Sequence, residues 1–397
     1  NFKISEVFQP KVLEVFKKGC YSKEAFTADL IAGIIVGIIA LPLAIAFGIA
    51  SGVSPQQGLI TAVVAGFLVS FFGGSHFLIG GPTGAFIVIV YGIVSQYGMS
   101  GLIIATVLAG IMLVIMGIFK LGSIIKFIPY PIVVGFTSGI AVVIFSTQMK
   151  DFFGLTIDNL PSEFIPQWTA YITNFGSFKL HEFLLSLGCL LIIIFWPKVT
   201  KKVPGSLIAI IVGTVASILL AKYAGIDFAT IGSKFPELVN GIEIPKPQAP
   251  KITYEVATSL FQPAFTIALL CAIESLLAAM VADGVTGKRH NSNTELIGLG
   301  VANIITPFFG GIPATGALAR TMANIGGKSP VAGIIHAIVL LLIFLFLMPY
   351  AVYIPLGCLA AILVMVAYNM SEWRTFKYLL KGTKTDVSVL LITFFLT

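Results

Sequence analysis

Two short segments, Pro82-Thr83-Gly84-Ala85 and Pro313-Ala314-Thr315-Gly316-Ala317, are near copies of each other, and each follows a Phe-Phe-Gly-Gly sequence, at residues 71–74 and 308–311. The chain therefore repeats itself across its two halves. Proline and glycine interrupt membrane-spanning helices, and paired interruptions at matching places mark the binding site of many transporters. A helix that begins at mid-depth directs free N–H groups at such a site, where they can hold an anion. The two segments thus predict both the fold and the position of the site.

The composition places most of the chain in a lipid bilayer. Among the 397 residues, 57% are hydrophobic and only 10% are charged, whereas an ordinary soluble domain has about 25% charged residues. Thirteen apolar runs approach or reach the length of about 20 residues that crosses a bilayer as a helix. The clearest are residues 30–50, 102–119, 183–196, 206–221 and 331–348. We predict a polytopic, all-α membrane protein.

The repeat divides the chain into two halves of opposite orientation. Seven spans precede about residue 224, and an odd number of spans inverts the copy that follows. In the first half, a short strand at Phe77-Leu78-Ile79 should lead into a half-helix that opens at Gly80-Gly81-Pro82. In the second half, residues 304–309 should lead into one that opens at Gly310-Gly311-Ile312-Pro313. We therefore expect a seven-plus-seven inverted repeat with two half-helices, each preceded by a short strand.

The net charge of +7 is explained by orientation in the membrane. A cytoplasmic N-terminus puts most of the 24 lysines and arginines on the cytoplasmic side, as the positive-inside rule requires. The lysines left on the outer side are Lys150, Lys179, Lys222, Lys234, Lys246 and Lys251. This distribution does not form the basic groove of a nucleic-acid-binding protein. We expect an integral protein of the plasma (inner) membrane, with the segments 150–180 and 223–257 outside.

The sequence shows no metal-binding or catalytic motif. The cysteines occur singly in or near apolar spans: Cys20, Cys189, Cys271 and Cys358. Three scattered histidines have no partner at metal-ligand spacing: His76, His181 and His336. Five polar residues at span ends are expected to be interfacial or to order loops: Asp29, Asp283, Lys288, Arg289 and His290. We expect no cofactor and no enzymatic activity.

Two ionisable side chains lie inside apolar spans, where insertion costs about 2.5 to 3.5 kcal/mol. Glu274 lies in the run 265–281, and Arg320 follows Pro313 by two helical turns. Burial disfavours the carboxylate, so Glu274 is predicted to carry a proton, or otherwise to make a structural bond between helices. The planar guanidinium of Arg320 suits a carboxylate, bicarbonate or sulfate. Its alternatives are an ion pair with Glu274 or extension to the interface.

The duplicated threonines are expected to form a neutral cradle for an anion. Thr83 and Thr315 are predicted in the first turns of the two half-helices, next to Gly84 and Gly316. An isolated threonine there would be an ordinary N-cap, and only the duplication favours a binding role. The small side chains of Ala85 and Ala317 would keep the approach to the backbone open.

With these residues in view, the chain resembles the sulfate permease (SulP) family of anion transporters over essentially its whole length. The motifs that carry the resemblance are residues 32–47, Gly80-Gly81-Pro82-Thr83-Gly84, residues 282–296, and Gly310-Gly311-Ile312-Pro313 with Arg320-Thr321. Members of the family usually end in a cytoplasmic STAS domain, which we expect to be absent from this chain. Because the last apolar run stops at Thr397, we expect the sequence to be part of a longer protein.

The resemblance implies fourteen spans in a core domain and a gate domain. A cytoplasmic N-terminal segment, 1–28, would precede spans one to four of the core and the start of the gate, 29–149. The gate would continue through 150–257 (spans five to seven). Spans eight to eleven of the core would occupy 258–350, and the truncated end of the gate 351–397. The gate would form a homodimer, and the core would move as a rigid elevator carrying the anion.

The resemblance also assigns roles to individual residues. Phe47 corresponds to an aromatic residue that lines the pocket, Thr83 to a substrate contact, and Ala319 with Arg320 to the anion-facing end of span ten. Glu274 falls where the family keeps an acidic coupling residue.

Sodium-coupled bicarbonate members pair an Asp at this position with a hydroxyl one turn later, where this chain has Ala278. The resemblance therefore favours H+ as the coupling ion, and Na+ held near Glu274 and Gly316 is the alternative.

The predicted function is a secondary active transporter of a small inorganic anion, with sulfate as the first candidate and protons as the coupling ion. Sodium-coupled bicarbonate transport and proton-coupled dicarboxylate transport are the alternatives. A passive anion channel on the same scaffold would not need the acid at Glu274. A nucleobase permease would be expected to carry a second acid at the position of Arg320.

Overall fold

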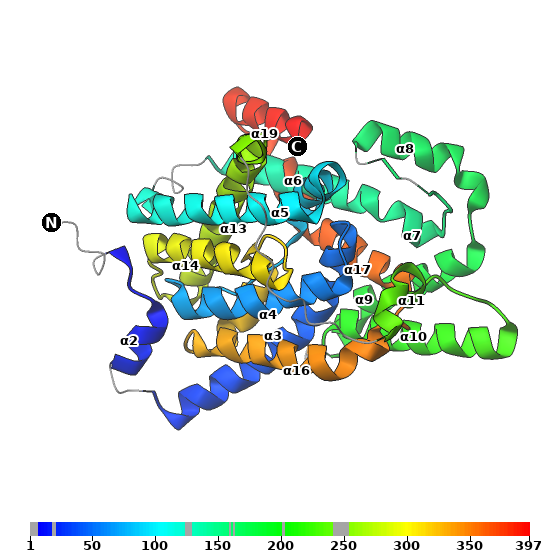
Figure 1. Ribbon diagram of the computed structural model, residues 1–397, viewed down its shortest axis with the longest axis horizontal. Coiled ribbons are helices and arrows are strands. Elements are labelled where there is room, and N and C mark those ends of the chain that lie inside the picture. The colour runs from blue at the N-terminus through cyan, green and yellow to red at the C-terminus, as the bar shows by residue number, and fades with distance from the viewer. Residues whose placement is uncertain are drawn as a thin grey trace. The chain divides into compact units, whose positions relative to one another are not determined.

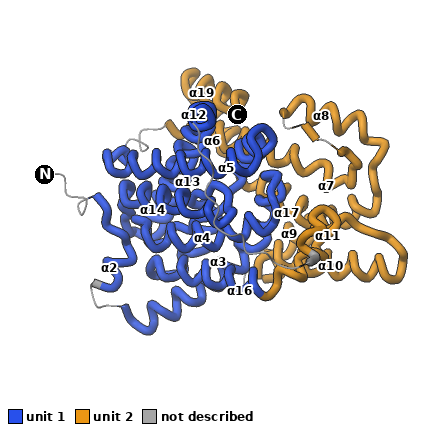
Figure 2. Tube along the Cα trace, in the orientation of Figure 1, with its two compact units in different colours: residues 1–127, 243–345 blue, residues 128–242, 346–397 orange. Residues whose placement is uncertain are grey.

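The computed structural model describes residues 7–17, 21–123, 129–158, 160–161, 163–200, 203–240 and 254–397, and it is almost entirely helical (Figure 1). The chain forms two compact units (Figure 2). Unit 1 comprises residues 1–127 and 243–345, and unit 2 comprises residues 128–242 and 346–397. Each unit therefore combines one segment from each half of the sequence. The assignment of core and gate roles stays a prediction.

The helices of unit 1 surround the duplicated segments. They are α2 (Lys11–Lys17), α3 (Lys23–Ala50), α4 (Pro55–Phe72), α5 (Ile87–Ile118), α12 (Tyr254–Ser259), α13 (Phe261–Thr286), α14 (Ser292–Ile305), α15 (Leu318–Ala323) and most of α16 (Val331–Ala351). α14 packs on α5 and α4, and α13 packs on α5. A methyl group at Gly300 would lie 2.6 Å from the carbonyl oxygen of Gly110, so small residues let α5 and α14 meet backbone to backbone.

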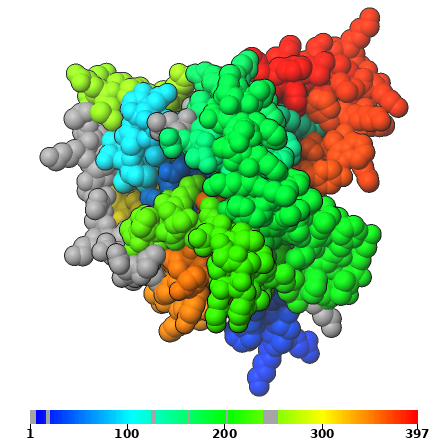
Figure 3. All heavy atoms as spheres, turned by 90° about the vertical axis from the view of Figure 1, so that its right-hand side faces the viewer, coloured from blue at the N-terminus to red at the C-terminus, as the bar shows by residue number. Residues whose placement is uncertain are grey.

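Unit 2 consists of the remaining helices. They are α6 (Tyr130–Thr147), α7 (Met149–Phe153), α8 (Phe164–Thr173), α9 (Leu180–Val199), α10 (Gly205–Ala224), α11 (Ile231–Lys234), α17 (Leu356–Met370), α18 (Trp373–Leu379) and α19 (Lys384–Leu396). α17 packs on α9 and α6, and α19 packs on α6. Figure 3 views the molecule from the side of α8, α9 and α10. The apolar stretches of α9 and α10 are only 22% and 17% buried, so this apolar surface is suited to lipid or to another protein chain.

The predicted spans are helices. In the described part of the chain, nine helices are long and apolar enough to cross a membrane. The sequence count of thirteen is larger because α14, α15 and α19 are shorter, and because α5 contains two predicted spans separated at Gly98, whose φ of 66° interrupts the helix. α3 begins at Lys23 rather than near residue 30, since the side chain of Ser22 accepts a hydrogen bond from the Ala25 N–H.

The two duplicated segments meet as an antiparallel pair of strands. β1 (Gly80–Gly81) pairs with β2 (Thr315–Gly316), with Gly80 opposite Gly316 and Gly81 opposite Thr315. After β1, the short 3₁₀ helix η1 (Gly84–Phe86) leads directly into α5. After β2, α15 and the 3₁₀ helix η6 (Asn324–Gly326) complete the second copy. The predicted arrangement of a strand followed by a half-helix is therefore confirmed in both copies.

The predicted positions of the strands were wrong. In the first copy the strand is formed by the two glycines and not by residues 77–79, because Gly81 adopts a φ of +153° that glycine favours. In the second copy the strand follows Pro313, because residues 306–309 form the 3₁₀ helix η5 (Thr306–Phe309). Two further 3₁₀ helices, η3 (Phe175–Ser177) and η4 (Pro236–Asn240), lie in connections of unit 2.

The cysteines that the structure describes, Cys189, Cys271 and Cys358, are free and buried, as expected of small apolar residues. Cys20 lies outside the described residues, and so do residues 241–253 of the segment predicted to lie outside the membrane.

Candidate functional site

Arg320 lies at the centre of the paired segments. α15 carries this side chain, which is only 1% exposed, and its Nη2 donates a hydrogen bond of 2.6 Å to the carbonyl oxygen of Pro82. A Cβ atom at Gly81 would collide with Nη1, so the guanidinium packs directly on the backbone of β1. Its Nε and Nη1 atoms are buried and have no hydrogen-bond partner. A buried donor without a hydrogen-bond partner is unfavourable. The Nε and Nη1 groups of Arg320 are therefore available to bind a ligand.

Glu274 faces the first copy from α13. Its half-buried carboxylate accepts a hydrogen bond of 3.1 Å at Oε2 from the hydroxyl of Thr83. Thr83 stands directly before η1, and its side chain does not cap that helix. Glu274 and Arg320 attract each other electrostatically, yet among the described residues they form no ion pair within 4 Å. The predicted alternative of a direct ion pair between them is therefore wrong.

The position predicted for Thr315 was wrong. Thr315 lies in β2 and not in the first turn of a half-helix, and it is fully buried. Its hydroxyl oxygen lies 2.7 Å from the hydroxyl oxygen of Ser275 and donates to the carbonyl of Cys271 at 3.0 Å. The Gly316 N–H donates to the same Ser275 oxygen at 2.8 Å. These bonds fasten β2 to α13, and the predicted contact of Thr315 with an anion stays a prediction.

The other predicted site residues are distributed around the strands. Gly84 and Ala85 are buried in η1, and Ala317 precedes α15, in which Ala319 is exposed. Phe47 is buried on α3, a helix that packs against α15. The structure thus brings all predicted residues into unit 1, while their contacts with a substrate stay predictions.

Asn303 holds the second copy in place and was not predicted. This buried side chain of α14 donates from Nδ2 to the Ala314 carbonyl and accepts at Oδ1 from the Ala314 N–H, both at 2.8 Å. The Asn303 amide therefore makes the two hydrogen bonds to the Ala314 backbone that a neighbouring strand would otherwise make. Polar residues inside an otherwise apolar helix were the signal that could have identified it.

Two side chains of α4 complete the support of the second copy. The Thr61 hydroxyl accepts from the Ile312 N–H at 2.8 Å, and the Gln57 amide donates to the Gly310 carbonyl at 3.1 Å. The two lie four residues apart, on one face of the helix. The backbone N–H and C=O groups of a non-helical segment within a membrane need hydrogen-bond partners from the protein. The side chains of Thr61 and Gln57 provide two of these partners.

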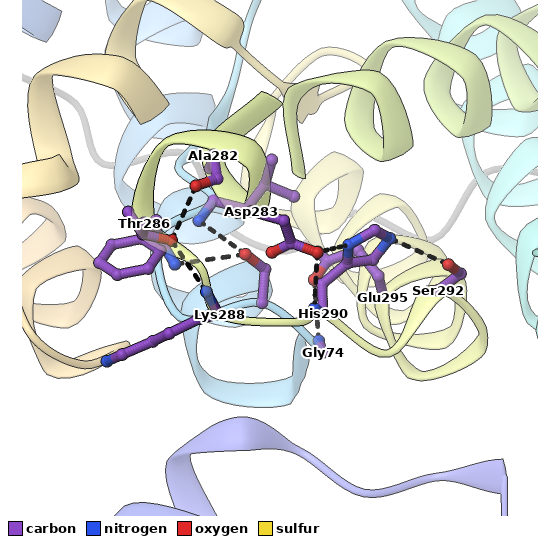
Figure 4. A network of polar contacts seen from close by, with 11 residues as sticks. Gly74, Ala282, Asp283, Thr286, Lys288, His290, Ser292 and Glu295 are labelled. Carbon is purple, nitrogen blue, oxygen red and sulfur yellow. Dashed lines mark hydrogen bonds and ion pairs between the residues drawn. The ribbon is translucent and has the colours of Figure 1, made fainter. Parts of the chain in front are cut away.

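A second polar network orders the connection between α13 and α14 (Figure 4). Asp283 Oδ2 accepts from the His290 backbone N–H at 2.9 Å and lies 2.6 Å from His290 Nδ1. The other ring nitrogen of His290 lies 2.9 Å from the Ser292 hydroxyl oxygen. The buried Glu295 accepts from the Gly74 N–H at 2.8 Å. The expectation that Asp283 and His290 order a loop is confirmed.

Two interrupted segments that pair inside a bundle of membrane-spanning helices, beside a buried arginine and a carboxylate, are typical of membrane transporters. Residues 26–393 match the Sulfate permease family, and the chain belongs to this family. It is a membrane anion transporter and not an enzyme, as the sequence predicted.

Similar proteins agree with this assignment. The chain is 46% identical over 379 residues to the protein named "Putative sulfate transporter YvdB" of Bacillus subtilis (strain 168), covering 95% of this chain and 71% of that protein. It is 33% identical over 366 residues to "Bicarbonate transporter BicA" of Picosynechococcus sp., covering 85% and 61% of the two chains. The solved transmembrane domain of a cyanobacterial BicA superposes with a TM-score of 0.85 at 31% identity, covering 94% of this chain and 95% of that one.

Proposed function

We propose that the protein is a secondary active transporter of a small inorganic anion, with sulfate as the first candidate. The observation that carries the proposal is the buried Arg320, whose Nε and Nη1 remain unpaired beside the strand pair. Charge-assisted hydrogen bonds from guanidinium to an oxyanion are strong and directional. The anion would lie between the N-terminus of η1 with α5 and the segment that carries Arg320. The residues assigned to it are Phe47, Thr83, Gly84, Ala85, Thr315, Gly316, Ala317, Ala319 and Arg320.

The choice of sulfate rests on the relatives. The sulfate-named relative is 46% identical and the bicarbonate-named relative 33% identical to this chain. Bicarbonate is the second candidate, supported by the TM-score of 0.85 with the BicA membrane domain. Both anions present oxygen atoms that the same donors can bind.

Glu274 is the proposed coupling residue. A proton on this carboxyl group would change its hydrogen bond with Thr83, which stands at the start of the first half-helix, so protonation and anion binding could influence each other. We assign H+ as the coupling ion. Na+ near Glu274 and Gly316 is the competing assignment, and Ala278, one helical turn after Glu274, offers it no oxygen ligand from a side chain.

The remaining assignments concern assembly and movement. The exposed apolar faces of α9 and α10 support a homodimer formed through unit 2. Unit 1 would carry the bound anion across the bilayer in an elevator-type movement. The protein would lie in the plasma membrane with a cytoplasmic N-terminus, because that orientation places most lysines and arginines inside.

Uptake by proteoliposomes tests the proposal. We expect labelled sulfate to accumulate when an inward proton gradient is imposed, and Arg320→Ala to reduce uptake at least tenfold, because hydrogen bonds to charged groups contribute about 1.5 to 3 kcal/mol. The exposed Arg374 of unit 2 provides a matched control, Arg374→Ala, which should retain uptake. Sulfate and bicarbonate uptake that is unchanged in Arg320→Ala would reject the proposed site. Full sulfate flux in Glu274→Gln, driven by the sulfate gradient alone, would instead indicate a passive channel.

A further inference from the structure

Two cysteines of unit 2 lie in contact inside the protein. Cys189 is on α9 and Cys358 is in the first turn of α17, and neither residue is more than 2% exposed. Both are free thiols, and their Sγ atoms lie 2.8 Å apart although the residues are separated by 169 positions in the chain. The S–S bond of a disulfide is about 2.05 Å long, so a small approach of the two sulfur atoms would complete a bond.

The helices around this thiol pair approach each other closely. α17 packs on α9 and α10 (Figure 1). One turn before Cys189, the hydroxyl of Ser186 lies against Gly357, where it would collide with a Cβ atom. On α10, a Cβ atom at Gly213 would collide with the Sγ of Cys358 and lie 2.8 Å from the Sγ of Cys189. These small residues bring the backbones close together, as a disulfide requires, and leave the space that the two sulfur atoms fill.

A cavity of unit 2 leads to the first turn of α17. The cavity has a volume of about 270 Å³, and its lining includes Glu182, Ala229 and Leu356. These residues form a chain of hydrogen bonds from α9 to α17, because Glu182 Oε1 accepts from the Ala229 N–H at 2.7 Å and the Ala229 carbonyl accepts from the Leu356 N–H at 2.8 Å. Cys358 follows Leu356 by two residues. A small oxidant in this cavity therefore comes within one helical turn of the thiol pair.

We propose that Cys189 and Cys358 form a reversible disulfide bond, which links α9 to α17 when a hydroperoxide oxidises the pair. The hydroperoxide transfers one oxygen atom to the first thiol, which becomes a sulfenic acid. The sulfur of the second thiol then attacks the first sulfur: the S–S bond forms, the S–O bond breaks, and the oxygen leaves as water with the proton of the second thiol. The two sulfur atoms lose two electrons in total, and the hydroperoxide accepts them. A dithiol reductant reverses the reaction by thiol–disulfide exchange.

Cys271 provides a matched control within the chain. It is buried to the same extent as the pair, but its sulfur contacts the Ala314 carbonyl at 3.2 Å and the Asn303 amide at 3.7 Å instead of another thiol. A buried thiol is unreactive unless its surroundings promote reaction. A sulfenic acid at Cys271 would also have no neighbouring thiol to condense with, so we expect this residue to stay reduced.

Peptide mapping of the purified protein tests the inference. The protein in detergent is reduced, treated with hydrogen peroxide, unfolded in the presence of an alkylating reagent and digested without reductant. We expect mass spectrometry to find the peptides of Cys189 and Cys358 joined, with a mass lower than their sum by two hydrogen atoms, and Cys271 alkylated. Dithiothreitol should separate the joined peptides. If Cys189 and Cys358 are both alkylated while glutathione in the same solution is fully oxidised, or if either is joined to another cysteine instead, the inference is wrong.

Thermal unfolding provides a second test that needs no variant. A covalent link across 169 positions of the chain restricts the unfolded state, so oxidation of the unaltered protein should raise the midpoint of unfolding by several degrees. An unchanged midpoint in protein that carries the joined peptides would overturn the proposed link between the helices. Cys358→Ser should lose the rise on oxidation, whereas Cys271→Ser should keep it. An equal rise in Cys358→Ser would assign the effect to another oxidation and contradict the inference.

Discussion

The two copies of the duplicated segment differ in how they are held. In the first copy, β1 leads through η1 into the long helix α5, and the Thr83 hydroxyl bonds to the carboxylate of Glu274. In the second copy, side chains of three helices fix the backbone before and within β2, and the helix that follows, α15, has only six residues. The matching threonine, Thr315, is used in this support. The second copy, which leads to Arg320, is thus held by hydrogen bonds from neighbouring helices. The first copy is bonded instead to the carboxylate of Glu274.

Among the substitutions that test this difference, replacing the amide of Asn303 should have the largest effect on stability. Asn303→Leu leaves the buried N–H of Ala314 without a partner and its carbonyl oxygen with only the Cys271 thiol, whose Sγ lies 3.2 Å away. At about 1 to 3 kcal/mol for an unsatisfied buried group, the free energy of unfolding should fall by about 1 to 3 kcal/mol. Denaturation in detergent measures this fall. Asn174→Leu, at an exposed position of unit 2, is the control, and an equal loss in both variants would contradict the special role of the second copy.

The two threonines should respond differently to the same substitution. Thr315→Val removes hydrogen bonds that fasten β2 to α13, so we expect a loss of about 1 kcal/mol in stability. Thr83→Val removes the donor to Glu274, so we expect a changed dependence of sulfate uptake on pH with little change in stability. Thermal unfolding and uptake at several pH values, measured on both variants, test the contrast. Identical behaviour of the two variants would show that the copies are functionally equivalent.

The smallest expected effect concerns His76, in the connection between α4 and β1 and outside the spanning helices. Burial, followed by the positive charges of Lys288 and Lys11, lowers the pKa of His76 from 6.5 to about 4. Between these values the unfolded chain binds more protons than the folded protein, so stability decreases as the pH falls from about 6.5 towards 4. Unfolding measured at pH 7 and pH 4.5 should show a smaller pH effect in His76→Gln. An unchanged pH effect would contradict this prediction, and His181→Gln is the control.

Much of the fold could be predicted from the sequence, because the length and apolarity of a membrane span are local properties. The duplicated glycine and proline motifs also identified the pair of interrupted segments. The strand positions could not be predicted, since they depend on the backbone of Gly81 and on side chains from distant helices. Asn303 was missed because nothing in its own span indicates that it pairs with Ala314.

The pairing of β1 with β2 has a consequence for biosynthesis. Pro82 and Arg320, which are bonded across this pair, are separated by 238 positions in the chain. When a ribosome has inserted the first half into the bilayer, the backbone of Gly80 and Gly81 still has no partner strand. The insertion machinery or neighbouring helices must therefore shelter these polar groups until the second half arrives, and the strand pair forms only after residues 315–320 have been synthesised.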